Sequence, residues 1–360
     1  MQRLFYLLML VMMGIALEAF CLVVYASRLV LAEPIYRYEY FSCNGCKTIK
    51  SDEVSDLPLS TPLGWGYYDP EIGWDSYRNG KRVGPSELSP CGSAFGDSFT
   101  HADEVKDSEA WPFRLSELLG CEIENYGAGG YGQDQAYLKY LKYHPNGDLV
   151  IVAMTQEMLR RNLAASWRFY AGLPNTVPKP IFHIKAGQLV LERAPQQLDA
   201  AQIAAHHRFD RYAAPFRIGF PYSLSLLKVL YYRMVPSAYA ANRIEPFNTV
   251  WNTPAAVNLS IKLFAAHVGD AKRDNKKFVL LLVPSTGDVA SNQRVYTAYR
   301  ERVAEAVPGV CIIDLLTPLR AQYELSGPLN APEQHFNAVG NQAIATAVLN
   351  GIKDCGLVGS

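Results

Sequence analysis

The sequence lacks an excess of charge, because its 34 Lys and Arg residues are balanced by 34 Asp and Glu residues. It also lacks the runs of Lys or Arg that form a phosphate-contacting face, which argues against a nucleic-acid partner. No internal repeat or low-complexity tract is evident. With 49% hydrophobic residues over 360 positions, the chain can bury the core of one large or two ordinary domains.

Signs of a metal or cofactor site are scarce. Cys43 and Cys46 form a C-x-x-C pair, but no second pair of Cys or His follows at the spacing of a zinc site. The glycines between 127 and 132 do not fit G-x-G-x-x-G, the pattern of dinucleotide-binding loops. We therefore expect no metal and no cofactor, with a zinc half-site as the alternative interpretation of the cysteine pair.

Long apolar runs are absent except near the first residue. Leu4 to Ala26 form such a run, interrupted by Glu18, and it is long enough to cross a bilayer as a helix. A charge in mid-span costs about 3 kcal/mol on insertion scales, which the other residues can offset. We predict an uncleaved anchor over 1–28 that places the remainder outside the cytoplasm of a bacterial-type cell, in the periplasm. A cleaved signal peptide and a buried core helix are the alternatives.

From Cys91 onward, apolar strand-like runs alternate with helical patterns, which predicts an α/β domain over 91–360 with a parallel sheet and helices on both faces. The expected strands are 92–95, 122–126, 148–154, 277–283 and 310–315, and the expected helices are 111–120, 133–143 and 338–352. Residues 160–275 are far too long for an ordinary connection, so we interpret them as an insertion that shapes or covers the site.

Residues 29–90 form an N-terminal extension rich in aromatic and turn residues. It has no long helical period, so loops and short strands are expected. Trp65 and Trp74 are predicted to pack onto the main domain, and an aromatic platform for a sugar is the alternative.

Six cysteines lie beyond the apolar run, and an even number in an exported domain suggests disulfides. Cys91 and Cys121 each precede an expected strand, and those two strands should be parallel neighbours. Cys311 opens another strand at the edge where the last helix, which carries Cys355, should end. We predict the pairs Cys91–Cys121 and Cys311–Cys355, and a tight Cys43–Cys46 pair.

The stretch from Cys91 to Thr100 reads C-G-S-A-F-G-D-S-F-T. Small and apolar residues lead to Gly96, which ends the strand and lifts Ser98 to the carboxyl end of the sheet, where open α/β folds place their sites. The G-D-S-F-T string resembles the first block of the SGNH (GDSL-type) hydrolases. The resemblance implies a flavodoxin-like three-layer fold and a nucleophilic role for Ser98; a plain turn is the alternative.

The segment Asn125 to Gly132 reads N-Y-G-A-G-G-Y-G and follows the second expected strand. Its glycines let the backbone approach a ligand and leave N–H groups for an anion. The segment resembles the second SGNH block. The resemblance implies that Gly130 lends its backbone N–H to the oxyanion hole; a plain Gly-rich turn is the alternative.

The third SGNH block, usually G-x-N-D, is not intact. The chain has M-T-Q-E-M there, which aligns Glu157 with the family's Asn, a side-chain donor to the oxyanion. An ionised carboxylate cannot donate, whereas Gln156 can if the loop differs by one residue. The following Arg160 and Arg161 are expected either to hold an anionic substrate group or to lie on a solvated helix face.

His335 lies in P-E-Q-H-F-N, just before the last expected helix, with Asn337 as a good N-cap. The segment resembles the final SGNH block, D-x-x-H, which implies that His335 is the general base. The family's Asp position is Pro332 here. Glu333 is the nearest acid and is expected to orient His335, with a backbone carbonyl as the alternative.

Together these blocks predict an exported esterase in which Ser98 and His335 hydrolyse carboxylic esters. The resemblance suggests acyl, and especially acetyl, esters of a polysaccharide as substrate. The alternatives are an O-acyltransferase with the same Ser–His pair and a non-catalytic carbohydrate-binding or assembly protein. The resemblance covers about 91–158 and 277–352, so the anchor, the extension and the insertion lie outside it.

Overall fold

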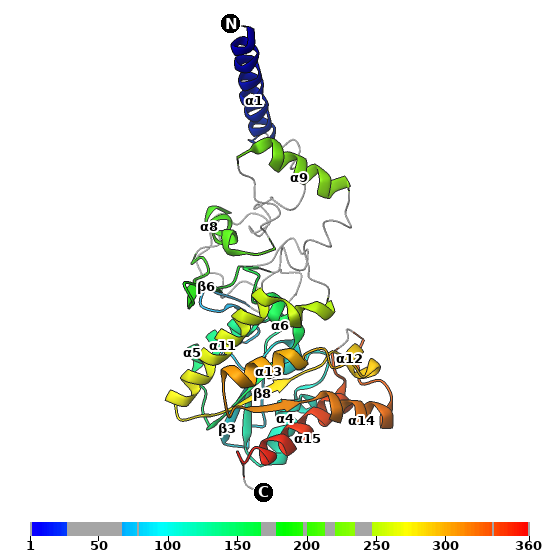
Figure 1. The fold of residues 1–360 in the computed structure, drawn as a ribbon. Helices are drawn as coiled ribbons and strands as arrows, with labels where there is room; N and C mark the ends of the chain where they lie inside the picture. The colour runs from blue at the N-terminus through cyan, green and yellow to red at the C-terminus, as the bar shows by residue number, and fades with distance from the viewer. Residues whose placement is uncertain are drawn as a thin grey trace.

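The computed structural model describes residues 2–26, 67–77, 79–166, 178–196, 200–212, 220–234, 247–332 and 335–358. Helix α1 (Gln2–Ala26) projects from one end of the molecule, and the α/β domain forms the other end (Figure 1). The described segments 178–196, 200–212 and 220–234 lie between these two parts (Figure 1).

The core of the molecule is a five-stranded parallel sheet, as the sequence predicts, and its strand order is β4-β3-β5-β8-β9. Its strands are β3 (Pro90–Phe95), β4 (Glu122–Asn125), β5 (Leu149–Met154), β8 (Lys277–Leu282) and β9 (Cys311–Asp314). Every residue of β5 is buried, because this strand lies at the centre of a sheet covered on both faces. The strand order is that of flavodoxin-like folds.

This order creates a switch point between β3 and β5. The chain leaves β3 toward β4 on one side and returns to β5 on the other, so the loops after β3 and β5 diverge. In open α/β sheets, ligands bind in the crevice that such diverging loops leave at the carboxyl ends of the strands. The residues that follow Phe95 and Met154 therefore line the expected position of a site.

Helices cover both faces of the sheet (Figure 1). The helices α4 (Trp111–Leu119), α14 (Leu316–Ser326) and α15 (Ala338–Asp354) pack on one face, with α4 against α15. The helices α5 (Gln133–Tyr143), α11 (Pro254–Arg273) and α13 (Thr297–Ala306) pack on the other. Shorter helices are α3 (Ser98–His101), η2 (Asp107–Glu109), α6 (Gln156–Arg161) and α12 (Thr286–Ser291).

The stretch 160–275 is more varied than a plain insertion. It contains the hairpin β6 (Ile181–Lys185) and β7 (Gln188–Glu192), and the helices α8 (Ala200–His206), η3 (His207–Phe209), α9 (Tyr222–Met234) and η5 (Phe247–Asn252). It ends in α11, whose Val257, Phe264 and Val268 belong to the main core. This helix makes the crossover from β5 to β8, so the last part of the stretch is a layer of the sheet domain.

The extension contributes a small hairpin, β1 (Tyr67–Asp69) and β2 (Gly73–Asp75), which packs on α5. Trp74 is buried, and its Nε1 donates to the carbonyl of Gly129 over 3.0 Å. This side chain therefore packs, as predicted, and offers no platform to a sugar. Trp65 lies outside the described residues.

Two disulfides lie at the amino end of the sheet. They join Cys91 to Cys121 and Cys311 to Cys355, the pairings predicted from the sequence. Cys43 and Cys46 lie outside the described residues.

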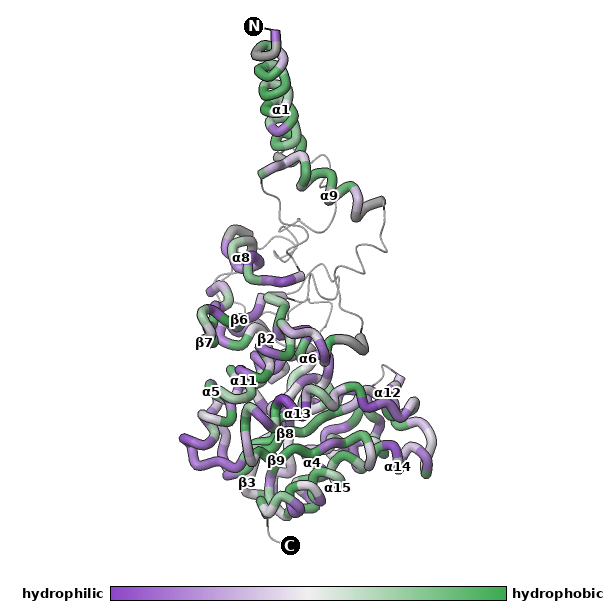
Figure 2. The backbone as a smooth tube through the Cα atoms, in the orientation of Figure 1, coloured by the Kyte–Doolittle hydropathy of each residue, from purple (hydrophilic) through white to green (hydrophobic). Residues whose placement is uncertain are grey.

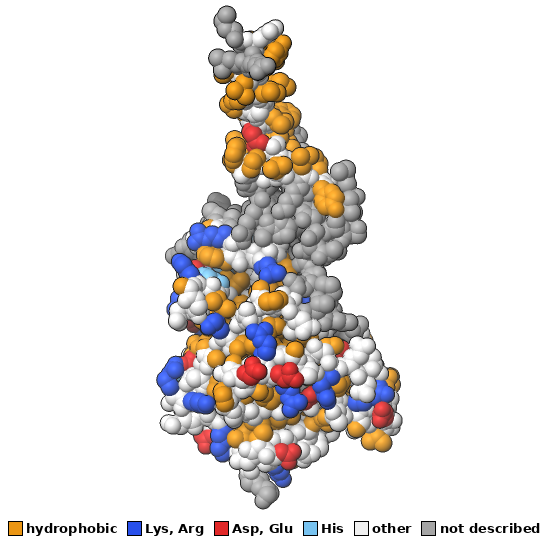
Figure 3. Space-filling view, in the orientation of Figure 1, with side chains coloured by type: hydrophobic (Ala, Val, Ile, Leu, Met, Phe, Trp, Pro, Cys, Tyr) orange, Lys and Arg blue, Asp and Glu red, His pale blue; other side chains and the backbone are white. Residues whose placement is uncertain are grey.

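Helix α1 contains the one stretch of the described residues that is long and apolar enough to cross a membrane, Phe5–Val24. Figure 2 shows its apolar character along the whole helix, and Figure 3 shows a single acidic side chain on its apolar surface. That residue is Glu18, whose carboxylate accepts hydrogen bonds from the backbone N–H groups of Tyr222 and Ser223, at the start of α9. The first turn of α9 thus satisfies the charge that interrupts the span.

Candidate functional site

Ser98 is the first residue of α3, directly beyond β3. Gly96 makes the turn possible, since a Cβ at this position would lie 2.1 Å from Thr100 Oγ1 and 2.9 Å from the carbonyl oxygen of Ala153. Asp97 caps the helix by accepting the N–H of Phe99 over 3.0 Å. The serine therefore stands at the switch point, as the sequence predicts, and its side chain is mostly buried.

Asp97 itself is fully buried and engaged. Its Oδ2 accepts the Thr155 hydroxyl over 2.6 Å and the Arg161 guanidinium over 3.0 Å. Thr155 follows β5 and Arg161 ends α6, so this carboxylate ties the loop after β3 to the loop after β5. Arg160 and Arg161 are both buried, so the expectation that they lie on a solvated helix face is wrong, and Arg161 instead binds Asp97.

The glycine segment after β4 packs closely against α3. A Cβ at Gly127 would lie 2.2 Å from the backbone nitrogen of His101, so only glycine permits this approach. The N–H of Ala128 donates to the carbonyl of Gly96 over 3.2 Å. Gly130 adopts a left-handed backbone conformation with φ +77°. The segment predicted to supply an oxyanion N–H thus lies beside the turn that carries Ser98.

Gln156 is the first residue of α6, just beyond β5. Its side chain is buried, yet neither its Oε1 nor its Nε2 has a hydrogen-bond partner among the described residues. Buried amides are nearly always paired, so the amide of Gln156 is available to a partner outside the described residues. Beside it, burial raises the pKa of the Glu157 carboxyl, and Arg161 and Arg160 offset only part of that shift.

His335 comes from the segment before α15 and meets α3. Its ring packs on Phe99, the residue after Ser98, with centroids 5.1 Å apart. Its Nδ1 is 2.8 Å from Glu104 Oε2, and its backbone N–H donates to the same oxygen over 3.1 Å. Positions more than 200 residues apart in the sequence are thereby brought together. Glu333, which was expected to orient His335, lies outside the described residues.

Glu104 was missed by the sequence analysis. It stands six residues after Ser98 in a polar stretch, and the chain carries no spacing signal that would connect it with a histidine 231 positions later. The family pattern directed attention to the residues just before His335 instead. The available signal was a carboxylate in the loop that follows Ser98.

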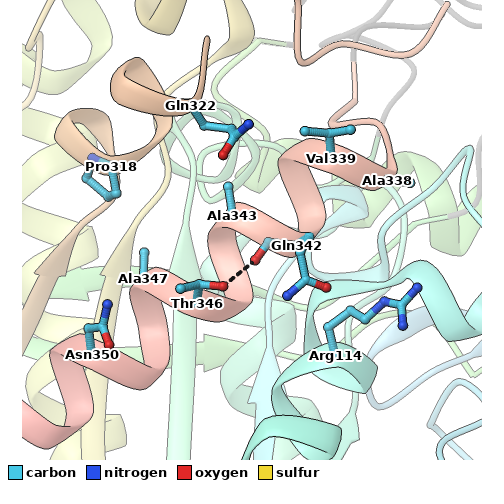
Figure 4. Close-up of a pocket in the computed structure, with 10 residues that line it drawn as sticks. All are labelled: Arg114, Pro318, Gln322, Ala338, Val339, Gln342, Ala343, Thr346, Ala347 and Asn350. Atoms are coloured by element: carbon cyan, nitrogen blue, oxygen red, sulfur yellow. Dashed lines mark hydrogen bonds between the residues drawn. The ribbon is translucent and has the colours of Figure 1, made fainter. Parts of the chain in front are cut away.

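A separate groove of about 520 Å³ lies on the outer surface of the domain, between α4, α14 and α15 (Figure 4). Val339, Ala343 and Ala347 form its apolar floor, and Gln322, Gln342 and Arg114 lie at its rim. Neither Ser98 nor Gln156 lines it, so the groove is distinct from the switch-point site. The described residues contain no cluster of three or more His, Cys, Asp or Glu side chains that would hold a metal ion.

No family model matches the sequence, and no curated protein matches it. Among solved structures, the chain is similar to an alpha/beta hydrolase enzyme from the metagenome of Lake Arreo, Spain, with 13% identity, 76% of this chain and 98% of that chain covered, and a TM-score of 0.42.

It is also similar to a member of the lipolytic protein G-D-S-L family from Veillonella parvula (11% identity, 73% and 97% covered, TM-score 0.39). A third similar structure is a catalytic mutant of an acetylxylan esterase from Geobacillus stearothermophilus (12% identity, 75% and 95% covered, TM-score 0.37). Similarities this distant leave the functional assignment to the residues around Ser98.

Proposed function

We propose that this protein is an SGNH-type esterase that hydrolyses carboxylic esters with Ser98 as nucleophile and His335 as general base. The observation that carries the proposal is the meeting of two distant segments at the switch point. His335 packs on the residue after Ser98, and a carboxylate holds its Nδ1. A serine, a histidine and a carboxylate are the residue types of nucleophilic acyl transfer, and the approach of their segments at the carboxyl end of the sheet supports this assignment.

In this mechanism the Ser98 hydroxyl attacks the ester carbonyl while His335 Nε2 takes its proton. His335 then returns the proton to the leaving alcohol, and water repeats the sequence to release the acid. Backbone N–H groups of Ser98 and Gly130 and the amide of Gln156 would stabilise the oxyanion. The unpaired, buried state of Gln156 supports that role, because a preorganised donor waits for charge that develops only in the transition state.

The substrate proposed is an acyl ester, and most readily an O-acetyl group, on a polysaccharide outside the cytoplasm. Support for the location comes from α1, which is apolar over Phe5–Val24, and from two disulfides, which persist in oxidising compartments. We propose that α1 remains as a membrane anchor. Its Glu18 accepts hydrogen bonds from the backbone of the first turn of α9, a contact that a retained α1 would keep.

Active-serine labelling tests the proposal. The full chain in detergent micelles is treated with a fluorophosphonate probe, and turnover of a small acetyl ester is followed in parallel. We expect labelling and turnover in the wild type, neither in Ser98→Ala, and a loss of at least 10³-fold in His335→Ala. Ser326→Ala, at an exposed serine, is the matched control and should behave like the wild type. A folded wild type that neither labels nor turns over the ester would overturn the assignment.

A further inference from the structure

The carboxylate that touches His335 comes from an unexpected place in the chain. The residue three positions before His335 is Pro332, which has no side chain able to accept a hydrogen bond. Glu104 reaches the histidine from the loop between α3 and η2 instead. A single oxygen, Glu104 Oε2, accepts from the backbone N–H of His335 over 3.1 Å and lies 2.8 Å from its Nδ1. Two contacts to one oxygen fix both the backbone and the ring of the histidine.

The other acids near α3 are committed elsewhere. Asp97 is bound by Thr155 and Arg161, and Asp103 pairs with the ring of His101. Among the residues that the structure describes, Glu104 is the one carboxylate bonded to His335. Its side chain and that of His335 are both largely shielded from water, with 13% and 17% exposed. Shielding strengthens a charge-assisted hydrogen bond relative to one in bulk solvent.

The loop that presents Glu104 is held by an arginine from the extension. Arg82 is buried, and its Nη1 donates to the carbonyls of His101 (2.5 Å) and Ala102 (2.7 Å). Its Nη2 donates to the carbonyl of Val105 over 2.7 Å, and its Nε pairs with Asp107 over 2.6 Å. The guanidinium therefore grips the loop on both sides of Glu104.

The loop needs such support because its backbone is strained. Ala102 and Glu104 both have a positive φ, of +63° and +71°, in a region that residues other than glycine rarely occupy. Strain of this kind persists only when surrounding contacts enforce it, and it is common at sites where geometry serves function. Arg82 supplies those contacts, and the conformation it enforces carries the Glu104 carboxylate to His335.

We propose that Glu104 is the positioning residue of the Ser98–His335 pair and that Arg82 acts through it; this rests on the esterase function proposed above. Glu104 accepts Nδ1–H of His335, which fixes the tautomer that leaves Nε2 to take the Ser98 proton. The carboxylate then stabilises the imidazolium while His335 holds that proton. The acid thus comes from the loop after the nucleophile, not from the segment before the histidine.

Kinetics of Glu104→Gln, Glu104→Asp and Glu333→Gln in the full chain with a small acetyl ester test this. Glu104→Gln keeps the shape but loses the charge, so we expect kcat to fall by about 10²–10⁴-fold with KM within about threefold of wild type. Glu104→Asp should recover part of the lost rate, because it restores the carboxylate. Glu333→Gln is the competing variant, and Glu117→Gln, at an exposed glutamate of α4, is the control that should retain wild-type kcat. A merely structural role would not produce this split between kcat and KM, nor rescue by Asp.

The outcomes separate this proposal from the esterase function itself. Normal turnover in Glu104→Gln with loss in Glu333→Gln, while Ser98→Ala stays inactive, overturns the role of Glu104 and leaves the esterase intact. Absence of turnover in the wild type overturns the function instead.

A double-mutant cycle tests the part played by Arg82. Arg82→Lys keeps the charge but loses the forked donors, so we expect kcat to fall about tenfold in the wild-type background and to stay unchanged in the Glu104→Gln background. Equal losses in both backgrounds would show that Arg82 does not act through Glu104. The position of the thermal unfolding transition, measured for each variant, confirms that the compared proteins are folded.

Discussion

The two ends of the central sheet are held together by different chemistry. At the amino end, two disulfides tie the strand starts to their neighbours. At the carboxyl end, in the part of the chain that the structure describes, buried ion pairs take their place: Asp97 with Arg161, and Asp134 with Lys179. The first kind of link is indifferent to the charges around it. The second depends on each partner, because a lone charge left in the interior is costly.

The buried ion pairs thus lie at the end of the sheet where the reaction is proposed to take place. Asp97 and Arg161 connect the loops on either side of the switch point, and Lys179 brings the stretch after α6 onto α5. A site built this way is sensitive to single substitutions, whereas the disulfide end tolerates them with only a loss of stability.

The largest effect is expected from breaking the carboxyl end at Lys179. Lys179 and Asp134 are both almost fully buried, and burial already raises the pKa of the Asp134 carboxyl. Lys179→Met keeps the bulk and leaves Asp134 without its partner, so we expect the free energy of unfolding to fall by about 3–5 kcal/mol. Urea unfolding measures it. The matched control, Lys179→Met with Asp134→Asn, should recover much of the loss; no recovery would mean that packing, not charge, holds this contact.

The next effect concerns activity at the same end. Gln156→Leu replaces an unpaired buried amide with an apolar side chain of similar size. If the amide serves the oxyanion, kcat falls by about 10²–10³-fold. Stability should rise, because an unsatisfied buried polar group costs about 1–3 kcal/mol. Ester turnover and urea unfolding of the same variant are the measurements. Unchanged turnover would remove Gln156 from the site, and Gln322→Leu, in the outer groove, serves as control.

The amino end should respond in stability alone. Replacing both Cys311 and Cys355 by Ser opens a loop of 44 residues, and chain-entropy arguments give a loss of about 2–4 kcal/mol. We expect kcat for the acetyl ester to stay within about twofold of wild type at 25 °C, since this link lies at the far end of the sheet. A large loss of kcat in folded protein would contradict the division between the two ends.

The smallest effect comes from a buried histidine between the two ends. His267 is enclosed by the rings of Phe95, Tyr137, Tyr140 and Phe278, and burial lowers its pKa to about 3. In the unfolded chain the His267 imidazole binds a proton near pH 6.5, whereas in the folded chain it stays neutral at that pH. Burial of the neutral His267 therefore contributes fully to the free energy of unfolding above about pH 6.5. Below that pH the free energy of unfolding falls by about 1.4 kcal/mol per pH unit, down to about pH 3.

His267→Leu should abolish that dependence. Relative to its value at pH 7.5, the free energy of unfolding of the wild type should fall by about 2 kcal/mol more at pH 5 than that of the variant. Urea unfolding at a series of pH values checks it. Parallel pH profiles for the two proteins would show that His267 does not titrate in this way.

The sheet could be predicted from the sequence because its central strands are continuous apolar runs. Runs such as L-V-I-V-A-M and K-F-V-L-L-L fit only fully buried strands, and turn glycines mark where Ser98 and the glycine segment follow. The pairing of Cys91 with Cys121 followed from the parallel neighbourhood of two strands. These features are local or depend on simple topology.

The sequence could not predict which side chain pairs with each buried charge. Glu104 meets His335, Arg82 meets the loop around Glu104, and Lys179 meets Asp134, each across a separation that no periodicity encodes. These contacts depend on how loops and the extension fold over the sheet. The end of the insertion was also placed too late from the sequence, at about residue 275. Helix α11 lies before that point, yet its apolar residues belong to the main core.

The segment before β3 has a further consequence for the shape of the molecule. Strand β4 is the last strand on its side of the sheet, and Arg82 pairs with its final residue, Asn125, while Lys81 pairs with Glu124 over 2.5 Å. This segment thus covers one end of the hydrogen-bonding edge that an outermost strand otherwise presents to other chains. A chain trimmed to residues 90–360 would keep every strand of the sheet but lose these contacts with β4. It would expose an edge of the sheet to self-association. It would also lose Arg82, whose hydrogen bonds hold the loop that presents Glu104.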